Sequence, residues 1–167
     1  MAKGLPTFIN PSALAEKGVV LQGDISLEKM TRLADSLYNT EGQAHIDWSF
    51  SLDNQERVLI QGSVQTELAM ECQRCLEVLL LPVDISVALM SLHKDQTEDN
   101  LLPDFEVLNL EAIPVLLTAL VEDELILALP LVAMHEQCSA IAYASHKETL
   151  VEEKPNPFQV LSVLKKS

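Results

Sequence analysis

Two alternating stretches in the first half of the chain constrain the fold more than any other feature. From Gln43 to Leu52 every second residue is apolar: Ala44, Ile46, Trp48, Phe50 and Leu52. The alternation returns from Val58 to Met70, after the turn-forming residues Asp53 to Gln55. Because successive side chains of a strand point to opposite faces, the pattern predicts two half-buried strands joined as an antiparallel hairpin.

Further strands are predicted on both sides of this hairpin. Residues Val19 to Ile25 form a short β-type run, and Leu76 to Met90 form a long one that we expect to bend or bulge around Pro82. The first eleven residues contain Gly4, Pro6 and Pro11 and predict a loop or an edge strand.

Two helices are expected to pack on these strands. Ser26 is a candidate N-cap for the first, and the second is predicted to hold Pro114 in its first turn and to end at Pro130. Its expected apolar stripe consists of Ile113, Leu117, Leu120 and Leu127. The fold class is therefore α+β, an antiparallel β meander with a few packed helices.

Residues 91–111 contain six acidic residues and one lysine. This composition predicts a flexible acidic loop, with a short strand near Phe105–Leu108. We expect residues 1–153 to form a single domain and residues 154–167 to form a C-terminal docking segment or tail.

The net charge of the chain is −14, from 25 acidic and 11 basic residues. Proteins that grip RNA through its phosphates carry basic patches, so the charge disfavours broad binding to naked RNA. An acidic surface suits a basic protein partner, and the alternative is that the charge serves solubility alone. Residues Met1 to Asn10 contain no apolar run of signal-peptide length, and no 18-residue apolar span follows, so we expect a cytoplasmic protein without a membrane partner.

Cys72 and Cys75 are separated by two residues at the corner between two predicted strands. Thiolates at this spacing can bind one metal ion, and His135 with Cys138 offers a second half-site. The sequence therefore predicts a structural zinc site as one interpretation. The other is that the three cysteines are reduced thiols beside an unrelated histidine. A thioredoxin-like role is disfavoured, because that motif opens a helix in a βαβ unit.

No catalytic residues are predicted. Glu122, Asp123 and Glu124 are adjacent on a predicted helix and point about 100° apart, so they do not converge on one substrate. Glu122 and Asp123 are expected on a solvated face, and Glu124 near the core with a partner. Phosphate-binding, nucleophile-elbow and metalloprotease motifs are missing from the sequence, and we expect a non-enzymatic protein without a small-molecule substrate.

Three blocks together resemble the YceD family of large ribosomal RNA subunit accumulation proteins. They are Leu68-Ala-Met-Glu-Cys-Gln-Arg-Cys75, Val121-Glu-Asp-Glu-Leu-Ile-Leu-Ala-Leu-Pro130 and Lys154-Pro-Asn-Pro-Phe-Gln-Val-Leu-Ser-Val-Leu-Lys165. The resemblance implies a bacterial cytosolic factor needed for accumulation of 23S ribosomal RNA, without an assigned catalytic activity. It also implies further cysteines after the acidic helix, where this chain has only His135 and Cys138.

Two mechanisms are compatible with this resemblance. In the first, the protein binds a basic ribosomal protein or a precursor large subunit, with Asp95, Glu98, Asp99 and Asp104 steering association and the segment around Phe158 docking. In the second, it contacts RNA through a local basic site formed by Arg74, Lys165 and Lys166.

Overall fold

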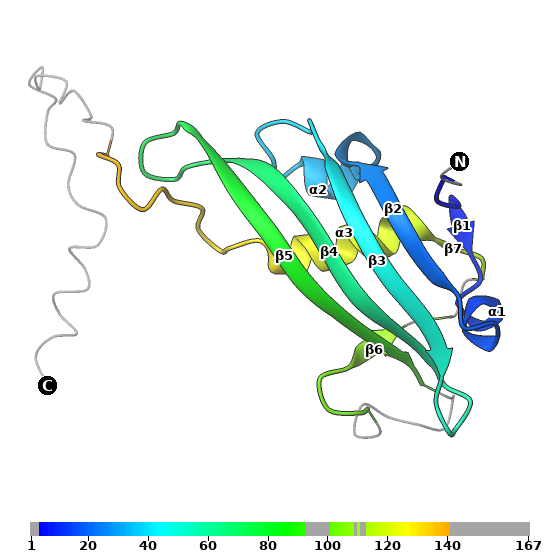
Figure 1. The fold of residues 1–167 in the computed structure, drawn as a ribbon. Coiled ribbons are helices and arrows are strands. Elements are labelled where there is room, and N and C mark those ends of the chain that lie inside the picture. Colours follow the sequence, from blue (N-terminus) through cyan, green and yellow to red (C-terminus); the bar gives the residue numbers. More distant parts are fainter. Residues whose placement is uncertain (1–3, 93–100, 109, 111–112, 141–167) are drawn as a thin grey trace, which may run out of the picture.

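The computed structural model describes residues 4–92, 101–108, 110 and 113–140. Its main element is a five-stranded sheet in the order β2-β3-β4-β5-β6 (Figure 1). The strands are β2 (Val20–Ser26), β3 (Gln43–Leu52), β4 (Val58–Glu71), β5 (Val78–Ser91) and β6 (Glu106–Leu108). The predicted α+β class is confirmed. No helix in the described residues is long and apolar enough to cross a membrane.

The two alternating stretches form the centre of the sheet. Strand β3 has the predicted bounds, and it pairs with β4 from Leu52↔Val58 to His45↔Gln65. Ala44, Ile46, Trp48 and Phe50 are all buried, whereas Leu52 at the end of the strand is 38% exposed. The Asp53 carboxylate closes the turn by accepting hydrogen bonds from the backbone N–H of Gln55 and Arg57.

Strand β5 differs from its prediction because it passes through Pro82 without a bulge. Its pairing with β4 is one-to-one from Glu71↔Val78 to Leu59↔Met90, and Pro82 lies opposite Glu67. Strand β6 pairs only with residues 89–91 of β5. Pro82 therefore lies on an edge, where a strand tolerates the loss of one N–H group.

Strand β6 is the short strand predicted near Phe105–Leu108, and it is parallel to β5, so the mostly antiparallel sheet is mixed at this edge. Parallel neighbours need a long connection, and the acidic stretch after Ser91 provides it. Residues 93–100 of that stretch lie outside the described residues, so its predicted flexibility stays a prediction.

Three helices and a 3₁₀ turn accompany the sheet, and one face of the sheet is covered mainly by α3 (Leu117–Ala128) (Figure 1). The others are α1 (Pro11–Glu16), η1 (Leu27–Lys29) and α2 (Thr31–Ala34). Ser26 precedes η1 without making a side-chain cap. Helix α1 was not predicted, although Asn10 accepts from the N–H of Ala13 and Pro11 opens the helix, which are standard start signals.

The predicted start of α3 is wrong, and its predicted apolar stripe is right for Leu117 and Leu120 but wrong for Ile113 and Leu127. Pro114 precedes a short strand, β7 (Val115–Leu116), which pairs with β1 (Phe8–Ile9) and delays the helix to Leu117. The buried apolar residues of α3 are Leu117, Val121 and Leu125, four residues apart, whereas Leu127 is 71% exposed. The end before Pro130 is as predicted.

The carboxylate buried by α3 is Glu122, not Glu124. Its side chain accepts hydrogen bonds from the backbone N–H groups of Arg32 and Leu33, at 2.6 and 3.0 Å, and from the Arg32 guanidinium. It thus caps α2, which has no cap of its own at Met30. Burial alone would raise the pKa of Glu122, but these donors outweigh it and the pKa is lowered.

We expect Glu122→Gln to lower the free energy of unfolding by about 2–3 kcal/mol at pH 7, because it removes the charge that pairs with Arg32 and caps α2. The native pKa lies below the unfolded one, so this contribution is present above the unfolded pKa and shrinks as the pH falls below about 4. Urea unfolding at pH 7 and at about pH 3 measures both effects.

Glu124→Gln is the matched control. Burial, helped by the charges of Glu106 and Asp123, raises the pKa of Glu124 to about 6. Ionised Glu124 therefore destabilises the fold as the pH rises toward that value, and its neutral variant should be as stable as the wild type or slightly more stable at pH 7. Equal losses in the two variants would contradict the assignment of Glu122 as the cap.

Candidate metal centre

The hairpin between β4 and β5 carries the C-x2-C motif at its tip. The backbone N–H of Cys72 donates to the carbonyl of Glu77, and the N–H of Leu76 donates back to the carbonyl of Cys72 at 2.8 Å. These bonds fold residues 72–77 into a tight knuckle. Cys72 is buried, and Cys75 is partly exposed.

The second half of the centre comes from the chain that follows α3. After Pro130 the backbone passes the hairpin tip, and we call residues 131–140 the strap. The N–H of Gln73 donates to the carbonyl of Ala133 at 2.8 Å, which attaches the strap to the knuckle. His135 and Cys138 thereby reach Cys72 and Cys75, which lie 60 to 66 positions earlier in the sequence.

The four side chains form one cluster. One ligand atom from each of Cys72, Cys75, His135 and Cys138 lies within 4.8 Å of all the others. The sulfurs of Cys72 and Cys138 are 3.8 Å apart, and Cys75 Sγ lies 3.3 Å from His135 Nδ1. Tetrahedral zinc with Zn–S bonds of about 2.3 Å and a Zn–N bond of about 2.0 Å separates such atoms by about 3.8 and 3.5 Å. The cluster therefore fits zinc.

The hydrogen bonds around the cluster favour the same chemistry. His135 Nε2 lies 3.2 Å from the carbonyl oxygen of Val78, which accepts its N–H and leaves Nδ1 as the lone-pair nitrogen facing Cys75. The backbone N–H of His135 donates to Cys72 Sγ at 3.4 Å. Metal-binding histidines are usually oriented by such a second bond.

The thiols of Cys72 and Cys138 differ in their ionisation. Burial alone would raise the pKa of Cys72, but N–H groups of Cys75, His135 and Arg74 lower it. Burial and the neighbouring thiols Cys72 and Cys75 raise the pKa of Cys138. The two opposite pKa shifts place the negative charge on Cys72 rather than on Cys138, because two adjacent thiolates repel each other.

Arg74, between the two cysteines, supports the strap. Its guanidinium donates to the carbonyls of Cys138 at 3.1 Å and His135 at 3.2 Å, and its Nη2 is 4.0 Å from Met134 Sδ. Its donors therefore point toward the protein's own backbone. Of the other predicted partner-binding residues, Asp104 is exposed, and Asp95, Glu98, Asp99, Phe158, Lys165 and Lys166 lie outside the described residues.

Two contributors to this centre have no signal in the sequence. The carbonyl of Val78 is a backbone group, so its role depends on where the strap crosses β5. Leu76 adopts a φ of +59°, a left-handed conformation that is costly for a branched side chain. Such strain persists where surrounding structure requires it, here the turn that brings the two cysteines together.

Fold and site together define an α+β protein with a zinc-type knuckle closed by a strap from its last described helix. A sequence model of the family described as "Large ribosomal RNA subunit accumulation protein YceD" matches residues 60–165. A protein of Haemophilus influenzae with the same description is 35% identical over 167 residues, covering 96% of each chain. No solved structure matches. The chain belongs to the YceD family.

We expect the purified protein to contain one zinc ion per chain, measured by atomic emission. Removing the ion with a chelator, or replacing His135 with Ala, should lower the melting temperature by on the order of 10 °C, because metal binding contributes directly to folding. His45→Ala is the control, since His45 is an exposed residue paired with Asp24 outside the cluster. Metal-free protein that melts unchanged when zinc is added would contradict the assignment.

Leu76→Gly should raise the free energy of unfolding of the zinc-loaded protein by about 0.5–1 kcal/mol. Glycine adopts a positive φ without a Cβ penalty, and the 53% exposed Leu76 side chain contributes little burial. Glu77→Gly, at the next position with an ordinary negative φ, should instead lower stability. Urea unfolding compares the two variants, and a loss in Leu76→Gly would show that no strain is relieved.

Proposed function

We propose that this protein supports the accumulation of large-subunit ribosomal RNA in the cytoplasm, and that it acts by binding a basic ribosomal protein or a precursor large subunit. The carrying observation is the relationship to the Haemophilus influenzae protein, because it extends over 96% of both chains. A likeness of that extent includes the sheet, the knuckle and the strap.

The chemistry of the metal centre supports binding rather than catalysis. Catalytic zinc sites keep one coordination position for water or substrate, whereas structural sites are filled by four protein ligands. Cys72, Cys75, His135 and Cys138 supply all four. Zinc held there would join the hairpin to the strap and leave no position for a reacting molecule.

Electrostatics supports a basic partner over naked RNA. The net charge of −14 attracts basic proteins and repels phosphates. The alternative basic site depends on Arg74, whose guanidinium donates to the carbonyls of His135 and Cys138. Ribosomal RNA would then be reached through its proteins, with the acidic residues after β5 increasing the rate of encounter.

The test neutralises four acids of this stretch together, as Asp95→Asn, Glu98→Gln, Asp99→Asn and Asp104→Asn. We expect weaker co-sedimentation with precursor large subunits and a smaller dependence on salt, with unchanged stability. In cells lacking the wild-type protein, this variant should restore 23S RNA, relative to 16S RNA, less fully than the wild type.

The matched control removes four exposed charges elsewhere, as Glu16→Gln, Glu28→Gln, Glu41→Gln and Glu56→Gln. It changes the net charge equally, so it separates a localised steering patch from overall charge. Equal effects of the two variants would assign the attraction to net charge alone. Wild-type protein that neither co-sediments nor restores 23S RNA would refute the proposed function.

A further inference from the structure

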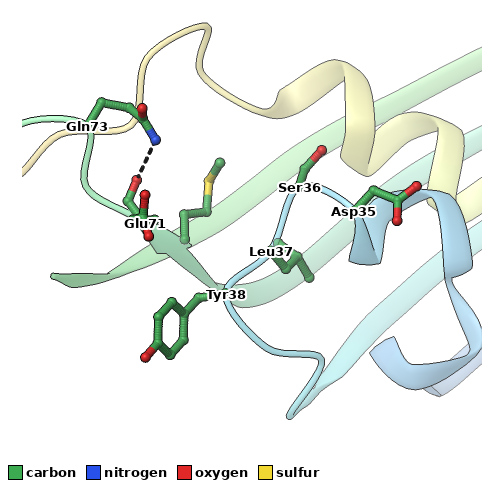
Figure 2. Close-up of a pocket in the computed structure, with 7 residues that line it drawn as sticks. Asp35, Ser36, Leu37, Tyr38, Glu71 and Gln73 are labelled. Atoms are coloured by element: carbon green, nitrogen blue, oxygen red, sulfur yellow. Dashed lines mark hydrogen bonds between the residues drawn. The ribbon is translucent and has the colours of Figure 1, made fainter. Parts of the chain in front are cut away.

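A groove lies beside the metal centre, where the end of β4 extends past β3. Pairing of β3 with β4 stops at His45↔Gln65. Beyond it the chain after α2 takes the place of β3, and the N–H of Tyr38 donates to the carbonyl of Ala69 at 2.7 Å. The groove between these segments has a volume of about 460 Å³. Its lining residues are Asp35, Ser36, Leu37, Tyr38, Met70, Glu71 and Gln73 (Figure 2).

The groove combines negative charge with an exposed aromatic ring. Asp35 and Glu71 are exposed, and neither carboxylate has an ion-pair partner among the described residues. The Tyr38 side chain is 57% exposed, whereas Met70 is 8% exposed and Leu37 is half-buried. Gln73 donates its amide N–H to the backbone carbonyl of Glu71, which holds it at the rim (Figure 2).

The arginines on either side do not neutralise this charge. Arg32 is held by Glu122 and Asp123, and Arg74 donates to the strap. Between these two arginines the sequence contains one other Lys or Arg, namely Arg57. Arg57 pairs with Asp53 in the turn at the opposite end of the β4 strand. Among the described residues, the lining of the groove therefore contains two carboxylates and no basic side chain.

These groups match the side chain of a lysine or an arginine. Its aliphatic stem suits the apolar surface of Leu37 and Met70, and its charged head suits the two carboxylates and the face of the Tyr38 ring. A negative groove with an aromatic wall disfavours phosphates and acidic peptides.

We propose that this groove binds a lysine or arginine side chain from a cationic segment of the basic protein partner, an assignment that rests on the proposed function. The surrounding surface suits such a partner. Exposed apolar side chains lie near the same end of the molecule, on the hairpin and the strap: Leu76, Val78, Leu80, Leu131, Val132 and Met134. They provide the apolar contacts that a protein interface requires around a charged anchor.

The test is an NMR titration of the isotope-labelled full chain in zinc-containing buffer with a synthetic ten-residue peptide of lysine, arginine and leucine. The resonances of Tyr38 and Gln73 should shift saturably. The double variant Asp35→Asn/Glu71→Gln should bind about three- to tenfold more weakly. The matched control Asp47→Asn/Asp84→Asn removes two charges from the middle of the sheet, outside the lining of the groove, and should bind like the wild type.

The ring of Tyr38 provides a second, independent readout. Tyr38→Phe keeps an aromatic face and should retain most of the affinity, whereas Tyr38→Leu should lose about two- to fivefold. Equal losses in the two double charge variants, or equal affinities of Tyr38→Phe and Tyr38→Leu, would overturn the proposal.

Two other occupants of the groove, the chain's own C-terminus and RNA, would give results that differ from those of a basic peptide. A shift of the Tyr38 resonance in peptide-free Lys165→Gln/Lys166→Gln protein would place the chain's own C-terminus in the groove. Saturable shifts of Tyr38 and Gln73 with a ten-nucleotide RNA would identify an RNA site. Either result would overturn the assignment to a basic protein.

Complementation in cells that lack the wild-type protein distinguishes failure of the groove assignment from failure of the proposed function. Asp35→Asn/Glu71→Gln protein should restore 23S RNA less fully than Asp47→Asn/Asp84→Asn protein. Full restoration by the groove variant would overturn the link between groove and partner while the proposed function stands. No restoration by wild-type protein would refute the function, and the peptide titration would still decide whether the groove binds cations.

Discussion

The carboxylate of Glu122 connects parts of the molecule that the chain does not connect locally. It projects from α3, accepts the N–H groups of Arg32 and Leu33 and pairs with the Arg32 guanidinium. A buried charge is tolerated only with such partners, so the position of α3 against α2 is specified by more than apolar packing. Because α3 leads directly into the strap, the same contact determines where His135 and Cys138 lie.

The metal centre connects the strap that follows α3 to the tip of the β4–β5 hairpin. The β4–β5 hairpin continues past β3, so its tip has only one strand pair to stabilise it. The strap supplies the missing contacts through the bond between Gln73 and Ala133 and through the donors of Arg74. Zinc bound by residues from both segments would convert this open end into a rigid one.

The arrangement of charge follows from these same contacts. Arg32, Arg57 and Arg74 all donate to groups of the protein itself, so three of its eleven basic residues serve the fold. Acidic residues remain on the surface, among them Asp35 and Glu71 beside the knuckle. These surface acids, with the net charge of −14, favour basic partners.

The sequence by itself determined the central strands and predicted which four side chains would cluster. Alternation has a period of two, so the bounds and buried face of β3 could be read from Gln43 to Leu52, and the spacings around Cys72 and His135 indicated the four members of the cluster. The stripe of α3 was partly misread because its apolar residues allow more than one helical face. Only the tertiary structure decided that Glu122 is buried, that β6 is parallel and that Tyr38 lies beside Glu71. Each of these depends on segments distant in the chain, and local patterns carry no information about which distant group will meet a side chain.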